Sequence, residues 1–249
     1  MDLFKMKLES RFDNLWYSKK VISNRRLTFG LIYYLIFHLF VLPLGVIALL
    51  KISTSLSGDE ILNVYQMYSD SFSGILLIII LWPLFKENLV IFLQNLFGIS
   101  FNGAKWYFPS ILSNAFLSFA IIMLTGIEQS SNQLAVEALL KANFWGMFIP
   151  AVLVAPIIEE LVFRGIVFRS LRKFGFLPAA IVSGLFFGLL HCLGDITSGN
   201  WPGVIYLLVY MNMGIFMCKA YEDSKNLFGA IVLHFINNLV SVIMIMSVM

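Results

Sequence analysis

Long runs without charge divide this chain and restrict the folds open to it. Most are long enough for a helix to cross the ~30 Å hydrocarbon core of a membrane. The composition agrees, because hydrophobic residues make up 59% of the 249 residues and charged residues only 12%. In lipid, only helices and closed barrels satisfy their backbone polar groups, and no alternating ten-residue pattern suggests a barrel. The runs cover residues 27–50, 71–85, 106–127, 142–158, 174–194, 196–218 and 226–249.

We therefore predict an all-α, polytopic transmembrane helical bundle of about seven spans. The run 71–85 is short and contains Pro83, so six or eight spans remain open. Polar side chains divide the chain further, because ionisable and amide groups at membrane depth concentrate in its second half. We expect a basic leader over residues 1–26, an N-terminal transmembrane scaffold over 27–140 and a site-bearing transmembrane region over 141–249.

The N-terminal leader is rich in basic residues, and its apolar residues recur at helical spacing. An amphipathic helix lying in the membrane interface fits this pattern, with a disordered basic segment as the alternative. The basic excess places the N-terminus in the cytoplasm. Short loops and the lack of an organelle signal suggest a multi-pass protein of a bacterial plasma membrane. The excess of basic residues on the cytoplasmic side explains the net charge of +3. The net charge therefore gives no reason to predict nucleic-acid binding.

Three charges lie in the otherwise apolar sequence AlaProIleIleGluGluLeuValPheArgGly, residues 155–165. A charge at the centre of a spanning helix costs ~2.5–3.5 kcal/mol even on insertion scales, so Glu159, Glu160 and Arg164 need partners or a function. Glu160 and Arg164 are four residues apart and can neutralise each other on one helix face. Glu159 projects about 100° away from Glu160 and is left without a partner.

Two later spans each carry a histidine one turn from another notable residue. Phe187 precedes His191 by four residues, and His234 precedes Asn238 by four. From the ends of the apolar runs, a rise of ~1.5 Å per residue puts Glu159 about 15 Å, His191 about 20 Å and His234 about 12 Å from the cytoplasmic side. We predict that these side chains meet in one intramembrane cavity, open toward the cytoplasm. The alternative for any one of these residues is structural, because an intramembrane His or Asn more often hydrogen-bonds to a neighbouring helix than belongs to a functional site.

These residue types suit hydrolysis of an amide by water. Glu159 beside a neutral His191 can hold and deprotonate a water molecule. His234 and Asn238 can donate hydrogen bonds to the oxyanion that forms when this water attacks a carbonyl. The alternative is zinc, since Glu159, His191 and His234 form a catalytic ligand set with an open position. No HisGluXXHis segment supports zinc, and we favour the reading without a metal or other cofactor.

The chain resembles a known family in these same segments. GluGluLeuValPheArg at 159–164, PheGlyLeuLeuHis at 187–191 and HisPheIleAsnAsn at 234–238 match its GluGluXXXArg, PheXXXHis and HisXXXAsn motifs, in the same order. The resemblance covers about residues 142–240 and is to the CAAX protease and bacteriocin-processing (Abi) family of intramembrane peptidases. It implies that residues 141–249 form the catalytic region.

The resemblance implies roles position by position. Glu159 and His191 would activate water, and His234 and Asn238 would form the oxyanion hole, with Asn237 as second choice for the amide. Glu160, Arg164 and Phe187 would support the site. The family has been argued both as glutamate-type and as metal-dependent.

The substrate we expect is a hydrophobic peptide or membrane-associated protein, such as a bacteriocin or pheromone leader or a CAAX-like protein. A nonenzymatic membrane immunity or scaffold protein is the alternative of another class, and transport is a weaker third.

Overall fold

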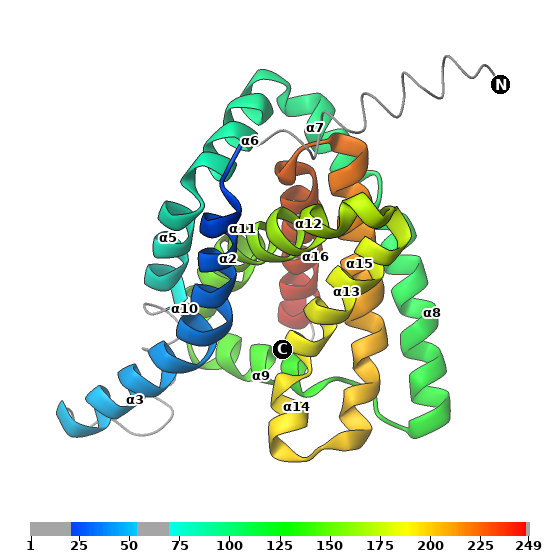
Figure 1. Ribbon diagram of the computed structural model, residues 1–249. Coiled ribbons are helices and arrows are strands. Elements are labelled where there is room, and N and C mark those ends of the chain that lie inside the picture. Colours follow the sequence, from blue (N-terminus) through cyan, green and yellow to red (C-terminus); the bar gives the residue numbers. More distant parts are fainter. Residues whose placement is uncertain (1–20, 54–69, 248–249) are drawn as a thin grey trace.

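The computed structural model describes residues 21–53 and 70–247, and every regular element within them is a helix (Figure 1). The prediction of an all-α bundle is therefore confirmed. The predicted amphipathic leader lies mainly outside the described residues.

Within each described range, the helices follow one another through short turns and bends. The N-terminal elements are α2 (Asn24–Ile32), η1 (Tyr33–Val41), α3 (Leu42–Ser53), α5 (Asp70–Ile80), α6 (Trp82–Gln94), α7 (Leu96–Ala104), α8 (Tyr107–Thr125) and α9 (Ser131–Ala142). The remaining elements are α10 (Phe144–Phe148), η3 (Ile149–Val154), α11 (Ala155–Val162), η4 (Phe163–Phe168), α12 (Arg169–Leu171), η5 (Arg172–Phe174), α13 (Phe176–His191), α14 (Leu193–Ser198), η6 (Trp201–Tyr206), α15 (Leu207–Ser224) and α16 (Leu227–Ser247).

Continuous helices long and apolar enough to cross a membrane number 5 in the described part of the chain, or up to 6 with one bent pair. The bent pair is α5 and α6, which meet at 91° just before Pro83. The helix α13, in the predicted run 174–194, is apolar but shorter, at 16 residues. The five are Asn24–Ile52, Leu96–Thr125, Phe144–Phe174, Trp201–Ser224 and Leu227–Ser247. The protein is thus a multi-pass membrane protein, and its span count reaches the range that the sequence predicts.

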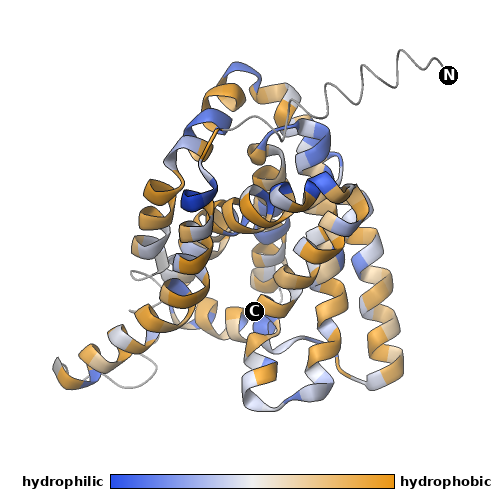
Figure 2. Cartoon of the chain, in the orientation of Figure 1, coloured by the Kyte–Doolittle hydropathy of each residue, from blue (hydrophilic) through white to orange (hydrophobic). Residues whose placement is uncertain are grey.

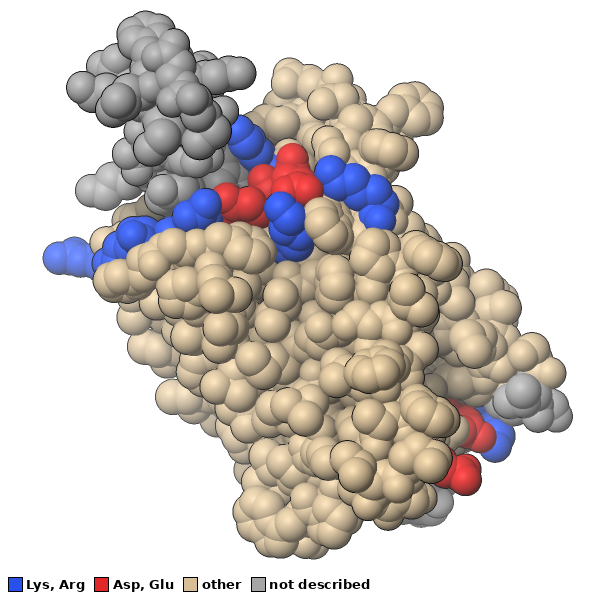
Figure 3. Space-filling model, turned by 90° about the vertical axis from the view of Figure 1, so that its right-hand side faces the viewer, with Lys and Arg blue, Asp and Glu red and all other residues tan. Residues whose placement is uncertain are grey.

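Charged residues gather at the two ends of the bundle, with an apolar belt between them (Figures 2 and 3). At one end, ion pairs join the α7–α8 turn, η5 and the end of α15, through Lys105–Asp223 at 3.1 Å and Arg172–Glu222 at 2.6 Å. Asn226, next to these, donates to the carbonyl of Asn88 on α6. We call this the basic end. Figure 1 shows α6 and α7 at this end and α9 at the opposite end.

The core of the bundle depends on close contact between α13 and α15. A Cβ added to Gly214 on α15 would lie 2.8 Å from the Cα of Gly184 on α13, and 3.3 Å from Nη2 of Arg164. Small residues of this kind let helix backbones approach within a membrane. The contact matters for the site, because it brings the carbonyl of Gly214 within 2.9 Å of Arg164.

We predict that Gly214→Ala destabilises the protein by about 1–3 kcal/mol, because the added methyl group must push two helix backbones apart. Thermal unfolding in detergent, followed by loss of monodisperse protein, measures this effect. Gly45→Ala on α3 is the matched control, since a Cβ there meets nothing within 4 Å. Equal melting temperatures for the two variants would contradict the close-contact explanation.

Candidate active site

The site is built around an ion pair that is removed from solvent. Glu160 and Arg164 are both 0% exposed, and Nη1 of Arg164 donates to Oε1 of Glu160 at 2.8 Å. Their four-residue spacing on α11 and η4 places them on one face, as the sequence predicts. Nη2 of Arg164 donates to the Gly214 carbonyl, and its guanidinium lies 4.8 Å from the ring centre of Phe187.

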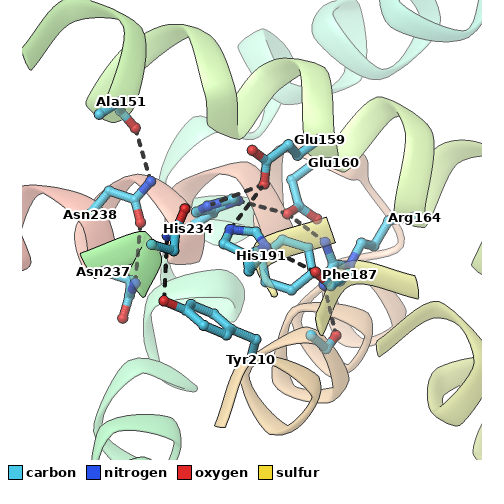
Figure 4. Close-up of polar contacts among 12 residues, drawn as sticks. Ala151, Glu159, Glu160, Arg164, Phe187, His191, Tyr210, His234, Asn237 and Asn238 are labelled. Atoms are coloured by element: carbon cyan, nitrogen blue, oxygen red, sulfur yellow. Dashed lines mark hydrogen bonds and ion pairs between the residues drawn. The ribbon is translucent and has the colours of Figure 1, made fainter. Parts of the chain in front are cut away.

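The same carboxylate also fixes His234 on α16. Nδ1 of His234 lies 2.9 Å from Oε1 of Glu160 (Figure 4). An ionised carboxylate only accepts hydrogen bonds, so Nδ1 of His234 carries the proton and donates. Its Nε2 is therefore turned the other way, toward Glu159. One buried pair thus connects α11, η4, α15 and α16 and sets the orientation of a histidine ring.

Glu159 projects from α11 in a different direction and lies between two imidazoles. Its Oε2 is 3.9 Å from Nε2 of His191 and 3.9 Å from Nε2 of His234. These distances exceed a direct hydrogen bond and match a gap that a water molecule can bridge. Within the described ranges, this buried Oε2 has no hydrogen-bond partner. A buried acceptor in this state calls for a water molecule or a substrate group.

His191 is held on both faces and at one nitrogen. Its ring lies between Phe187 at 4.3 Å and Tyr210 at 4.6 Å between ring centres. Nδ1 is 2.9 Å from the Phe187 carbonyl, so it donates a proton there. Nε2 is then the acceptor of the neutral ring and points at Glu159. The spacing of Phe187 and His191 thus provides a ring contact and a backbone acceptor for the same histidine.

Asn238 lies one turn beyond His234 on α16. Its Nδ2 donates to the carbonyl of Ala151 at 2.9 Å, and its Oδ1 accepts from Nδ2 of Asn237 at 3.2 Å. A side-chain amide has two N–H groups, so one remains beyond the bond to Ala151. Asn237 therefore orients the amide of Asn238.

These side chains line one cavity of about 260 Å³. Glu159, Phe187, His191, His234 and Asn238 border it, so the structure brings together the residues that the sequence singles out. Glu160 and Arg164 lie behind its wall. The other lining residues include Tyr34, His38, Asn132, Gln133, Val136, Met147, Pro150, Ala151, Tyr210, Met213, Met217, Asn237, Ser241, Val242 and Ile245.

The cavity extends away from the basic end of the bundle. Its lining follows α16 from His234 to Ile245 and includes the α9 residues Asn132, Gln133 and Val136. Both sets lie toward the end opposite the basic end, because α16 begins beside Lys225 and runs away from it. The sequence predicts both that the basic residues face the cytoplasm and that the cavity opens toward it. These two predictions conflict, because the cavity extends away from the basic end.

Most of the other lining residues were not predicted from the sequence, and Tyr34, His38 and Tyr210 are examples. Tyr34 and His38 reach the cavity from η1, and Nδ1 of His38 is 2.9 Å from Oγ of Ser73. His38 offers a signal, as an ionisable residue within an apolar run. Tyr34 and Tyr210 offer none, because aromatic residues are common in spans.

The donor set partly fits a metal. Both histidines hold their Nδ1 atoms against an oxygen, an arrangement that zinc-binding histidines share. However, no three His, Cys, Asp or Glu side chains are grouped closely enough to hold a metal ion in the part of the chain that the structure describes. The residue types thus suit zinc better than their spacing does.

Comparison with known proteins agrees with the motifs. The family model of type II CAAX prenyl endopeptidase Rce1-like proteins matches residues 141–240, which contain every motif residue above. The chain is thus similar to the Rce1-like family over the region that carries the motifs.

The chain is also similar to a protein of Bacillus subtilis. The protein described as "Putative membrane peptidase YdiL" of Bacillus subtilis (strain 168) is 28% identical over 173 residues. This match covers 68% of the chain and 66% of the relative, just under two thirds of the latter's length. No solved structure matches.

We predict that Arg164→Ala lowers the amount of folded protein in the membrane as well as any activity. Removing one partner leaves Glu160 buried without its cation, a loss of about 3–5 kcal/mol. Lys141→Ala is the control, because it breaks the exposed Lys141–Glu137 pair, which has the same i,i+4 spacing. That change should cost about 0.3–0.5 kcal/mol. Full expression and an unchanged melting temperature with only activity lost would instead place Arg164 in the reaction.

Proposed function

We propose that this protein is an intramembrane endopeptidase that hydrolyses a peptide bond in a hydrophobic peptide or membrane-associated protein. The main observation behind this proposal is the position of Oε2 of Glu159 inside the cavity. It lies 3.9 Å from the Nε2 atoms of both His191 and His234. The match of residues 141–240 to the Rce1-like family model supports the reaction class, and the name of the Bacillus subtilis relative agrees. A bacteriocin or pheromone leader and a CAAX-like protein are the substrate types we expect, in the plasma membrane of a bacterium.

The mechanism begins with a water molecule between Glu159 and His191. Nε2 of neutral His191 accepts one hydrogen bond from this water, and the Glu159 carboxylate takes its other proton as the oxygen attacks the carbonyl carbon. The resulting tetrahedral intermediate carries an oxyanion. When the carbon–nitrogen bond breaks, Glu159 returns its proton to the departing amine. Atoms and charges balance without a covalent enzyme intermediate.

The oxyanion needs donors on the other side of the cavity. Asn238 offers its second N–H group, since the first is bonded to Ala151. His234 can donate from Nε2 only as imidazolium, because Nδ1–H is engaged with Glu160. Glu160 thus acts through His234, as a positioning residue.

The test of this function is cleavage of membrane peptides by the purified protein, read by mass spectrometry. We expect defined products with the wild type and none with Glu159→Gln, because the amide cannot take the proton from water. Glu137→Gln on α9 is the control, since that carboxylate pairs with an exposed lysine outside the cavity. Peptide that binds equally to wild type and Glu159→Gln, with no product from either, would favour a nonenzymatic immunity or scaffold protein.

We predict that Asn238→Ala lowers turnover by about 10²–10³-fold with little change in peptide binding, because a preorganised oxyanion donor acts mainly in the transition state. Single-turnover kinetics on the peptide identified above measure this. Asn237→Ala is the comparison, since Asn237 acts through the Asn238 amide. A larger loss of turnover with Asn237→Ala than with Asn238→Ala would make Asn237 the oxyanion donor and Asn238 the residue that orients it.

Zinc is the alternative for the same site. Glu159, His191 and His234 would hold it, and the ion would activate water and polarise the substrate carbonyl. Metal analysis of active protein distinguishes the two. Stoichiometric zinc, removed by a chelator together with activity and restored by zinc alone, would overturn the metal-free mechanism.

A further inference from the structure

The two ends of the bundle differ strongly in basic residues. Most of the Lys and Arg side chains that the structure describes belong to elements at the basic end: Arg25, Arg26, Lys86, Lys105, Arg169, Arg172, Lys173, Lys219 and Lys225. The opposite end has Lys51 and Lys141, with Glu128, Glu137 and Asp195. Figure 3 shows the basic end as a band of charge beyond the apolar belt.

This asymmetry determines orientation in a membrane. Lys and Arg in short loops are retained on the cytoplasmic side, and acidic residues contribute little to the rule. The basic residues near the α7–α8, η5–α13 and α15–α16 turns lie in such loops. The basic end should therefore face the cytoplasm, and α9 and the end of α16 the other side.

The cavity extends toward this other side. Beyond Asn238, its lining continues along α16 through Ser241 and Val242 to Ile245. Helix α9 supplies Asn132, Gln133 and Val136 to the same wall. Helix α9 also packs there, because buried Leu140 clusters with Met147, Val242 and Ile245. Toward the basic end, by contrast, the catalytic groups are backed by buried Glu160 and Arg164.

From these observations we infer that the cavity receives its substrate from the extracytoplasmic side of the membrane. The lining indicates the chemistry of that substrate. Side-chain amides of Asn132, Gln133 and Asn237 can pair with the backbone of an extended peptide. Met147, Met213 and Met217 offer an adaptable apolar wall for its side chains. The substrate class is thus an apolar peptide segment exposed at the outer face, such as the membrane-proximal end of an exported peptide or protein.

The substrate class rests on the proposed peptidase function, whereas the orientation can be measured without any activity. Single cysteines are introduced at Gln133 or Ser241 in the cavity wall, and at exposed Lys173 at the basic end. Intact cells are treated with a membrane-impermeant maleimide before and after permeabilisation. The unmodified chain gives the background, since Cys192 and Cys218 are buried.

We expect Gln133→Cys and Ser241→Cys to be labelled in intact cells, and Lys173→Cys only after permeabilisation. Labelling of Lys173→Cys in intact cells, or of the two cavity cysteines only after permeabilisation, would overturn the inference. Failure to label either cavity cysteine in any condition would also overturn it, because the cavity would then not be open at that end. Loss of peptide cleavage in Glu159→Gln is independent of every one of these results.

Discussion

The structure depends on one ion pair that lipid and protein together exclude from water. Glu160 and Arg164 neutralise each other at a depth where either charge alone would be costly. Their remaining bonds reach the Gly214 carbonyl on α15 and the ring of His234 on α16. Because these partners belong to separate helices, the pair ties together the elements that border the cavity. The stability of the bundle and the orientation of a histidine ring therefore have a common origin.

Two neighbouring carboxylates carry out different tasks because of helix geometry alone. Successive residues on a helix point about 100° apart, so Glu160 enters the packed interior while Glu159 enters the cavity. Glu160 gains a guanidinium and an imidazole as partners. Glu159 keeps an oxygen without a hydrogen bond between two rings, within the described residues. Two consecutive glutamates in one membrane helix thus place one carboxylate in the packed interior and the other in the cavity.

Much of this arrangement was predictable from the sequence, because intramembrane charges have few ways to be satisfied. The i,i+4 pairing of Glu160 with Arg164 and the approach of His191 and His234 to Glu159 followed from spacing and depth. The approach of Tyr34 and His38 did not, since it depends on how η1 packs. The bend of 91° between α5 and α6 was equally hidden, because hydropathy does not report helix direction. The direction of the cavity is a property of the whole bundle and not of any motif.

The π-helical segments on either side of α11 have a consequence for how this chain can change. Elements η3 and η4 have wider turns than the α-helix between them. Such a segment corresponds to one extra residue accommodated in an otherwise α-helical path. Losing that residue from η3 would restore the α-helix there but turn everything before it by about 100° relative to Glu159 and Glu160. The carbonyl of Ala151, which holds Asn238, lies within that segment. A single-residue deletion in η3 would therefore rotate the preceding helix about its axis relative to α11. The length of η3 is thus constrained even at positions where its side chains only face lipid.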